Sequence, residues 1–107
     1  MENIRKFLPY LKEYGHTQGK PFVIDFYATW CAPCRAMSPF VEQLAREYSD
    51  VIDVIKIDIE KNEAFAAAAN IHSIPTLFFV DRNGNITRHT GSLPYPELER
   101  MTKIIIA

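Results

Sequence analysis

The chain has 107 residues, of which 48% are hydrophobic and 12% aromatic, and it carries a formal net charge of −1 with a pI near 6.3. This length is close to the commonest size of a folding unit, so we expect a single domain over residues 1–107 with one hydrophobic core. The nearly balanced charge gives no basic face for nucleic acid or for an anionic membrane, and we expect neither as a partner.

The first 20 residues have the pattern of an amphipathic helix. Their apolar side chains are Ile4, Phe7, Leu8 and Leu11. This spacing places them on one face of a helix over residues 3–14, whereas a signal peptide has a continuous apolar run. We therefore expect the protein to stay in the reducing cytoplasm, where a disulfide used only as a structural staple is out of place.

The following elements alternate between strands and helices. Residues 21–28 are an apolar run rich in β-formers, which predicts a buried central strand. The predicted elements after it are a helix over 33–48, a strand over 51–59, a short helix over 62–70, a hairpin of strands at 76–80 and 86–90, and a helix beginning at Pro96. This order predicts an α/β fold, with a mixed sheet that has parallel and antiparallel pairs and is covered by helices on both faces.

The two cysteines, Cys31 and Cys34, are separated by two residues and follow the predicted central strand. Pro33 suits the first turn of the next helix, so Cys31 is predicted to lie at a helix N-terminus. Unpaired amides and the helix dipole stabilise a thiolate there, which makes Cys31 the predicted nucleophile. Cys34 lies one turn further along the same side, and we expect it to be the more buried of the two. This arrangement favours a redox-active pair.

Two other interpretations of the C-x-x-C pair remain open at this point. A structural zinc site needs about four ligands. Besides the cysteines, the chain offers three scattered histidines, His16, His72 and His89. The second alternative is a pair of ordinary core cysteines that have this spacing by coincidence.

The residues around the cysteines resemble the thioredoxin family over the full chain. The matching segments are VIDFYATWCAPCRAMSPF (23–40), IKID (55–58) and SIPTLFFV (73–80), with Gly84 in the hairpin and Gly91 after it. The resemblance implies a thioredoxin fold, with a central mixed β-sheet of about five strands flanked by helices on both faces. The chain departs from the family at Ala32, where glycine is typical, and at Tyr27, where a second tryptophan is common.

The function that the resemblance implies is a protein-disulfide reductase, an electron carrier in cell redox homeostasis. Cys31 and Cys34 exchange their dithiol with disulfides of target proteins. No cofactor is bound, reducing equivalents come from NADPH through a flavoprotein thioredoxin reductase, and the protein is expected to be a monomer. Pro33 before the second cysteine favours a reductant, because strongly oxidising members of the family have histidine there. The competing hypotheses are an oxidase or isomerase of an oxidising compartment and a binding module whose redox chemistry is incidental.

Asp25 and Lys56 are isolated charges in two predicted apolar strands. Burial raises the pKa of a carboxyl, and the resemblance implies that Asp25 is the general base for Cys34, acting through water. The alternative is an Asp25 carboxylate that reaches solvent at the strand edge. Lys56 either tunes Asp25 or extends its ammonium to the sheet edge.

The resemblance also implies a flat apolar patch around Cys31 on which target proteins dock. A cis bond before Pro75 would leave the backbone of Ile74 free to pair with an extended substrate segment. The predicted substrate-binding residues are Trp30, Ala32, Pro33, Ile59, Ile74, Pro75, Thr90, Gly91 and Ser92. For Trp30, the alternative is packing in the core. We expect His72 at the rim of the patch and Arg35 in solvent.

Overall fold

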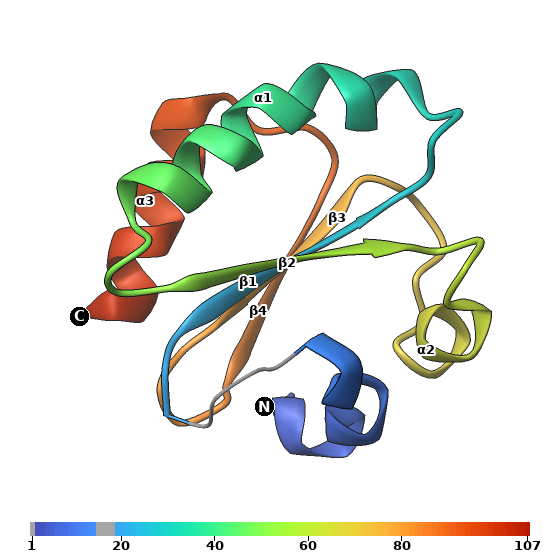
Figure 1. The fold of residues 1–107 in the computed structure, drawn as a ribbon, viewed down its shortest axis with the longest axis horizontal. Coiled ribbons are helices and arrows are strands. Elements are labelled where there is room, and N and C mark those ends of the chain that lie inside the picture. The colour runs from blue at the N-terminus through green and yellow to red at the C-terminus, as the bar shows by residue number, and fades with distance from the viewer. Residues whose placement is uncertain (1, 15–18) are drawn as a thin grey trace.

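A computed structural model describes residues 2–14 and 19–107 and contains a mixed four-stranded sheet (Figure 1). The strands are β1 (Phe22–Tyr27), β2 (Asp53–Asp58), β3 (Thr76–Val80) and β4 (Ile86–Thr90), in the spatial order β2-β1-β3-β4. β1 pairs in parallel with β2 and antiparallel with β3, and β3 pairs antiparallel with β4. The predicted parallel pair and the late hairpin are both confirmed.

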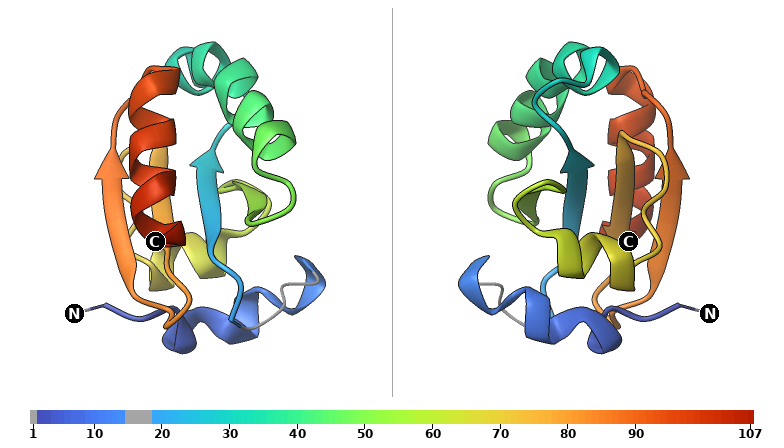
Figure 2. Two further views of the ribbon diagram at one scale, coloured as in Figure 1. Left: turned by 90° about the vertical axis from the view of Figure 1, so that its left-hand side faces the viewer. Right: turned by 90° about the vertical axis from the view of Figure 1, so that its right-hand side faces the viewer.

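Helices cover both faces of the sheet, as expected. The long helices α1 (Ala32–Glu47) and α3 (Tyr95–Ile106) lie on one face, and the short α2 (Glu63–Ala68) lies on the other with the N-terminal segment (Figures 1 and 2). Two hydrogen bonds fasten α1 to α3. The Tyr48 hydroxyl donates to Glu99 at 2.8 Å, and the Tyr95 hydroxyl donates to Glu47.

The alternation of side chains along the strands divides the core into two parts. On the α2 face, the strand residues Phe22, Ile24, Phe26, Phe78 and Val80 pack with Ile4, Phe7, Leu11 and Phe65. On the α1 and α3 face, Val23, Leu77 and Phe79 pack with Met37, Val41, Leu44, Leu98 and Ile105. Strands buried on both faces carry near-continuous apolar runs, which is why β1 and β3 could be recognised in the sequence.

The N-terminal segment differs from its prediction. It forms two 3₁₀ helices, Ile4–Tyr10 and Lys12–Tyr14, instead of one α-helix. Pro9 lies inside the first of them and has no backbone N–H to donate, which disfavours a regular α-helical turn. The predicted apolar face is nevertheless the buried one. His16 and the rest of the expected turn at 15–18 lie outside the described residues.

The sheet has four strands, where about five were expected. Within the described residues, the β-pairing of the N-terminal segment with the sheet is limited to an isolated bridge between Asn3 and Asn85. Two backbone hydrogen bonds support the bridge, from Ile4 N–H to the Gly84 carbonyl at 2.7 Å and from Ile86 N–H to the Glu2 carbonyl at 3.0 Å. The segment turns into the 3₁₀ helix directly after Asn3, so a fifth strand does not develop.

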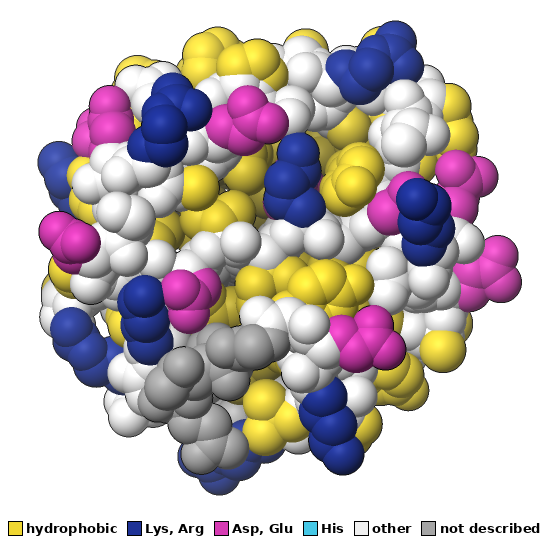
Figure 3. Space-filling view, in the orientation of Figure 1, with side chains coloured by type: hydrophobic (Ala, Val, Ile, Leu, Met, Phe, Trp, Pro, Cys, Tyr) yellow, Lys and Arg dark blue, Asp and Glu magenta, His cyan; other side chains and the backbone are white. Residues whose placement is uncertain are grey.

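Within residues 2–14 and 19–107, no helix has the length and apolar character needed to cross a membrane. The charged side chains of both signs are interspersed over the face seen in Figure 3. This distribution matches the small net charge of the chain.

Gly84 in the β3–β4 turn is expected to resist substitution for two separate reasons. Its φ angle of +84° disfavours any side chain, and a Cβ atom there would lie 2.8 Å from Asn3 Oδ1. Gly91 shares only the first property, because its φ is +104° and a Cβ atom at this position would meet nothing within 4 Å. Gly84→Ala should therefore lower the free energy of unfolding more than Gly91→Ala, which should cost about 1–2 kcal/mol for its backbone conformation.

Urea unfolding of the two alanine variants tests this prediction. Equal losses would show that the contact between the β3–β4 turn and the Asn3 side chain contributes nothing measurable.

Candidate active site

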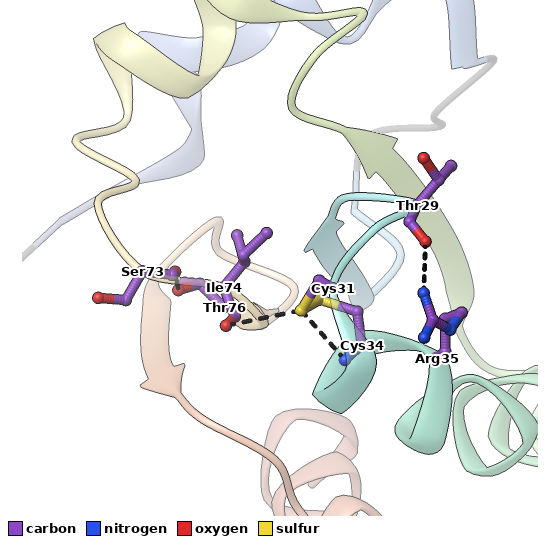
Figure 4. Close-up of a disulfide and its surroundings, with 7 residues drawn as sticks. All are labelled: Thr29, Cys31, Cys34, Arg35, Ser73, Ile74 and Thr76. Atoms are coloured by element: carbon purple, nitrogen blue, oxygen red, sulfur yellow. Dashed lines mark hydrogen bonds between the residues drawn. A yellow bond between two sulfur atoms is a disulfide. The ribbon is translucent and has the colours of Figure 1, made fainter.

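Cys31 and Cys34 form a disulfide at the start of α1, just beyond the end of β1 (Figure 4). Their Cα atoms are 5.3 Å apart, as the helical spacing predicts. Cys31 is the N-cap residue of α1, and its Sγ atom accepts a hydrogen bond from the Cys34 N–H at 3.3 Å. An unpaired amide at a helix N-terminus favours negative charge on the atom it meets, so this contact stabilises a thiolate at Cys31 in the reduced protein.

The expected difference in burial between the cysteines is wrong for the disulfide form. Cys31 is 4% exposed and Cys34 is 5% exposed. Both sulfurs are covered because Ala28, Tyr27, Ile59 and Ile74 pack around the pair. What distinguishes the cysteines in this structure is therefore the hydrogen bond to the Cys31 sulfur. Exposure does not distinguish them.

Asp25 is buried in the middle of β1, with 2% of its surface exposed. Its Oδ1 atom has no hydrogen-bond partner among the residues that the structure describes. Desolvation raises the carboxyl pKa to about 6, against an opposing effect from the positive charge of Lys56. The buried position predicted for Asp25 is confirmed, and the alternative of a carboxylate in solvent is excluded.

Asp25 shares a cavity with the second cysteine. The cavity has a volume of about 210 Å³, which is large enough for water. It is lined by Asp25, Tyr27, Ala28, Thr29, Cys34, Arg35, Ser38 and Lys56. Asp25 and Cys34 therefore line one space that can hold water. A larger cavity of about 320 Å³, between the N-terminal segment and the β3–β4 turn, contains none of the predicted site residues.

Lys56 lies on β2 directly opposite Asp25 in the parallel pair with β1. Its side chain is exposed, and its ammonium donates a hydrogen bond to Ser38 Oγ at 3.0 Å. The same ammonium lies 5.1 Å from the centre of the Tyr27 ring. The side chain therefore reaches solvent at the cavity rim, as one of the two interpretations of Lys56 expected, and its positive charge lowers the pKa of the Asp25 carboxyl.

The loop before β3 lies against the disulfide. The peptide bond between Ile74 and Pro75 is cis, as predicted. The Ile74 carbonyl oxygen is 3.9 Å from Cys31 Sγ (Figure 4). Two interactions hold this loop in place. Thr76 Oγ1 donates to the Ser73 carbonyl at 2.5 Å, and the Gly91 N–H donates to the Pro75 carbonyl at 2.9 Å.

The other predicted patch residues surround the cysteines with differing exposure. Trp30 is 63% exposed, which excludes the alternative of core packing. Ile59 and Ile74 are half-buried against the cysteine pair. The remaining exposed or half-buried members are Ala32, Pro33, Thr90, Gly91 and Ser92, and Pro75 is buried. His72 is exposed, as expected.

Two side chains near the site have structural contacts that the sequence did not predict. Arg35 Nη1 donates to the Thr29 carbonyl at 3.0 Å, which ties the loop before Cys31 to α1 (Figure 4). Ser38 reaches the cavity and Lys56. The helical spacing of four residues between Cys34 and Ser38 would have placed both on one face, but a serine in an amphipathic helix gives no further signal.

In the part of the chain that the structure describes, no three His, Cys, Asp or Glu side chains are grouped as metal ligands would be. The described histidines, His72 and His89, are not among the residues that pack around the cysteines. The geometry of the pair is that of a dithiol–disulfide couple.

Comparisons with known proteins agree with this geometry. The thioredoxin family model matches residues 7–103. Thioredoxin-1 of Drosophila melanogaster is 35% identical over 107 residues, which is 100% of both chains. The thioredoxin of Borreliella burgdorferi is 35% identical over 92 residues, 86% of this chain and 79% of that protein. The crystal structure of the germline-specific thioredoxin Deadhead of Drosophila melanogaster aligns with a TM-score of 0.79 at 34% identity, covering 99% and 100% of the two chains.

A mixed sheet between two helical layers, with a Trp-Cys-x-x-Cys pair at the start of a helix, defines a thiol–disulfide oxidoreductase. The chain belongs to the thioredoxin family. Members of this family are protein-disulfide oxidoreductases, and Cys31–Cys34 is the redox-active disulfide of this one.

Asp25→Ala is expected to stabilise the disulfide form at neutral and alkaline pH. The folded carboxyl keeps its proton up to about pH 6, whereas the unfolded carboxyl releases it near 3.8. The parent's stability is therefore fully present below the unfolded pKa, falls as the pH rises through the folded pKa, and stays reduced above it. The folded and unfolded pKa values of Asp25 differ by about two pH units, which corresponds to a loss of about 3 kcal/mol in the parent's free energy of unfolding. The variant lacks the carboxyl and does not have this loss.

Urea unfolding of parent and variant across the pH range measures this difference. It should grow between about pH 4 and pH 7 and then level off. A difference that does not change with pH would contradict the raised pKa of Asp25.

Proposed function

We propose that the protein works as a reductase of target-protein disulfides in the cytoplasm, as an electron carrier in cell redox homeostasis. The observation that carries this proposal is the Cys31 sulfur at the N-cap of α1, next to a cavity that joins Cys34 to Asp25. Pro33 between the cysteines supports the reducing direction, by resemblance to the reducing members of the family.

In the first step, the Cys31 thiolate attacks one sulfur of a target disulfide. A bond forms between Cys31 and that sulfur, and the other target sulfur leaves as a thiolate that takes up a proton from solvent. The hydrogen bond from the Cys34 N–H to Cys31 Sγ supports this assignment, because it stabilises the attacking thiolate.

In the second step, the Cys34 thiol loses its proton and its thiolate attacks Cys31 Sγ. The Cys31–Cys34 disulfide forms, the bond between Cys31 and the target breaks, and the target sulfur that was bound to Cys31 leaves as a thiolate. We assign Asp25 as the proton acceptor, through water in the shared cavity. A carboxyl with a pKa of about 6 suits this role, because it is mostly ionised at neutral pH yet binds a proton readily.

The target docks, in this proposal, on the apolar patch around the disulfide, with Trp30, Ile59 and Ile74 as its apolar members. The N–H of Ile74 is not among the paired backbone groups of the described residues. It is therefore available to an extended target segment that adds to this edge like a strand. The remaining proposed contacts are Ala32, Pro33, Pro75, Thr90, Gly91 and Ser92.

The oxidised pair is returned to the dithiol by a partner, in our proposal a flavoprotein thioredoxin reductase that draws on NADPH. This partner supplies two electrons and two protons, which restore both thiols. Each turnover therefore reduces one target disulfide. We further propose that a monomer with one domain over residues 1–107 carries the activity.

Cys31 is expected to alkylate much faster than Cys34 in the reduced protein at neutral pH. The amide contact stabilises the Cys31 thiolate, and the thiolate is the reactive form. Mass spectrometry after a short iodoacetamide pulse measures the label on each cysteine. Equal labelling would contradict the assignment of Cys31 as the nucleophile.

Cys34→Ser should trap target proteins on Cys31 as mixed disulfides, because the second step then lacks its nucleophile. Non-reducing gels of lysate treated with the variant should show adducts that dithiothreitol removes, and Cys31→Ser should show none. If neither variant gives adducts, the binding-module hypothesis replaces the reductase.

A further inference from the structure

The position of the Lys56 ammonium depends on a contact outside the predicted set of site residues. Lys56 is exposed at the rim of the cavity, and a lysine side chain in solvent has several rotatable bonds and no fixed position. In the structure its ammonium is nevertheless engaged twice, by Ser38 Oγ at 3.0 Å and by the face of the Tyr27 ring at 5.1 Å.

The effect of Lys56 on Asp25 does not come from an ion pair. Among the described residues, the ion pairs do not include one between these two side chains. The positive charge nevertheless opposes the effect of burial on the Asp25 carboxyl. An interaction across a gap weakens as the separation grows, so its strength depends on where the ammonium is held.

Ser38 is placed to hold it. The residue lies on α1 one turn after Cys34 and is half-buried, and both line the cavity that contains Asp25. Its hydroxyl is fixed to the helix that carries the cysteines, whereas Lys56 and Asp25 belong to neighbouring strands. The hydrogen bond therefore connects the charge on β2 to the helix of the redox pair.

We infer that Ser38 is a positioning residue of the active site, whose hydroxyl holds the Lys56 ammonium at the cavity rim and thereby sets how readily Asp25 takes up a proton. The inference rests on the proposed role of Asp25 as proton acceptor. It extends that role by naming the residue that tunes it.

Other charged or titratable groups around the cavity are already engaged. Arg35 donates to the Thr29 carbonyl, and Asp58, opposite Tyr27 on β2, accepts from the Glu60 N–H at 2.9 Å. From β3, Asp25 faces Leu77, which carries no charge. Lys56 is the cation that the Ser38 hydroxyl contacts, so a change at Ser38 acts on it directly.

The test is a carbon-13 titration of the Asp25 carboxyl in the disulfide form, where the cysteines do not titrate. Asp25→Asn removes one carboxyl resonance and so assigns it.

Ser38→Ala should raise the titration midpoint of Asp25 by about half a pH unit, which is a roughly threefold tighter hold on the proton, because the Lys56 ammonium moves out into water. Ser38→Thr keeps the hydroxyl and should restore the parent midpoint. Ser49→Ala, which removes an exposed hydroxyl just after α1, should change nothing.

Lys56→Met should also raise the midpoint, and adding Ser38→Ala to it should have no further effect. An unchanged midpoint in Ser38→Ala overturns the inference, and so does a shift that persists without Lys56. A failure of the proposed function appears in a different measurement, as an unchanged rate of mixed-disulfide release in Asp25→Asn. The titration midpoints do not depend on that rate.

Discussion

The burial of β1 on both faces governs this structure. The strand lies between β2 and β3, with Phe22, Ile24 and Phe26 toward α2 and Val23 toward α1 and α3. The chain passes from the end of the strand at Tyr27 to the start of α1, where Cys31 caps the helix. The same burial desolvates Asp25 and raises its pKa to about 6. One packing constraint thus supplies both the position of the sulfurs and a carboxyl that can exchange a proton near neutral pH.

The chemistry depends on differences of environment over a short stretch of chain. The Cys31 sulfur meets a helix amide, whereas Cys34 opens on the cavity of Asp25. Lys56 moderates the effect of burial on Asp25, since a fully desolvated carboxyl without a nearby cation would hold its proton more tightly. The site therefore combines a sulfur that meets a helix amide with a buried carboxyl whose pKa is raised by burial and lowered by one exposed charge.

Much of this could be predicted from the sequence, because the features involved leave local patterns. The apolar runs of β1 and β3, the turn at 81–85 and the spacing of Cys31 and Cys34 each specify their own structure. The buried charge at Asp25 could be recognised because it interrupts an apolar run. The cis bond before Pro75 followed from the family resemblance alone.

The features that were missed depend on contacts between distant segments. The 3₁₀ form of residues 4–10, which contain Pro9, is not shown by the spacing of the apolar residues, and the bridge from Asn3 to Asn85 joins segments far apart in the sequence. The equal burial of the two cysteines depends on Ile59 and Ile74, which come from two other loops. The contact of Ser38 with Lys56 could not be predicted, because it depends on how α1 packs against β2.

The most direct test of the reductase assignment is the midpoint potential of the Cys31–Cys34 couple, measured by equilibration in glutathione buffers. We expect a midpoint potential of about −270 mV, as for a reductant of this family, which is below the glutathione potential of an oxidising compartment. A value near about −120 mV, typical of a dedicated oxidant, would contradict the account and assign the protein to disulfide formation.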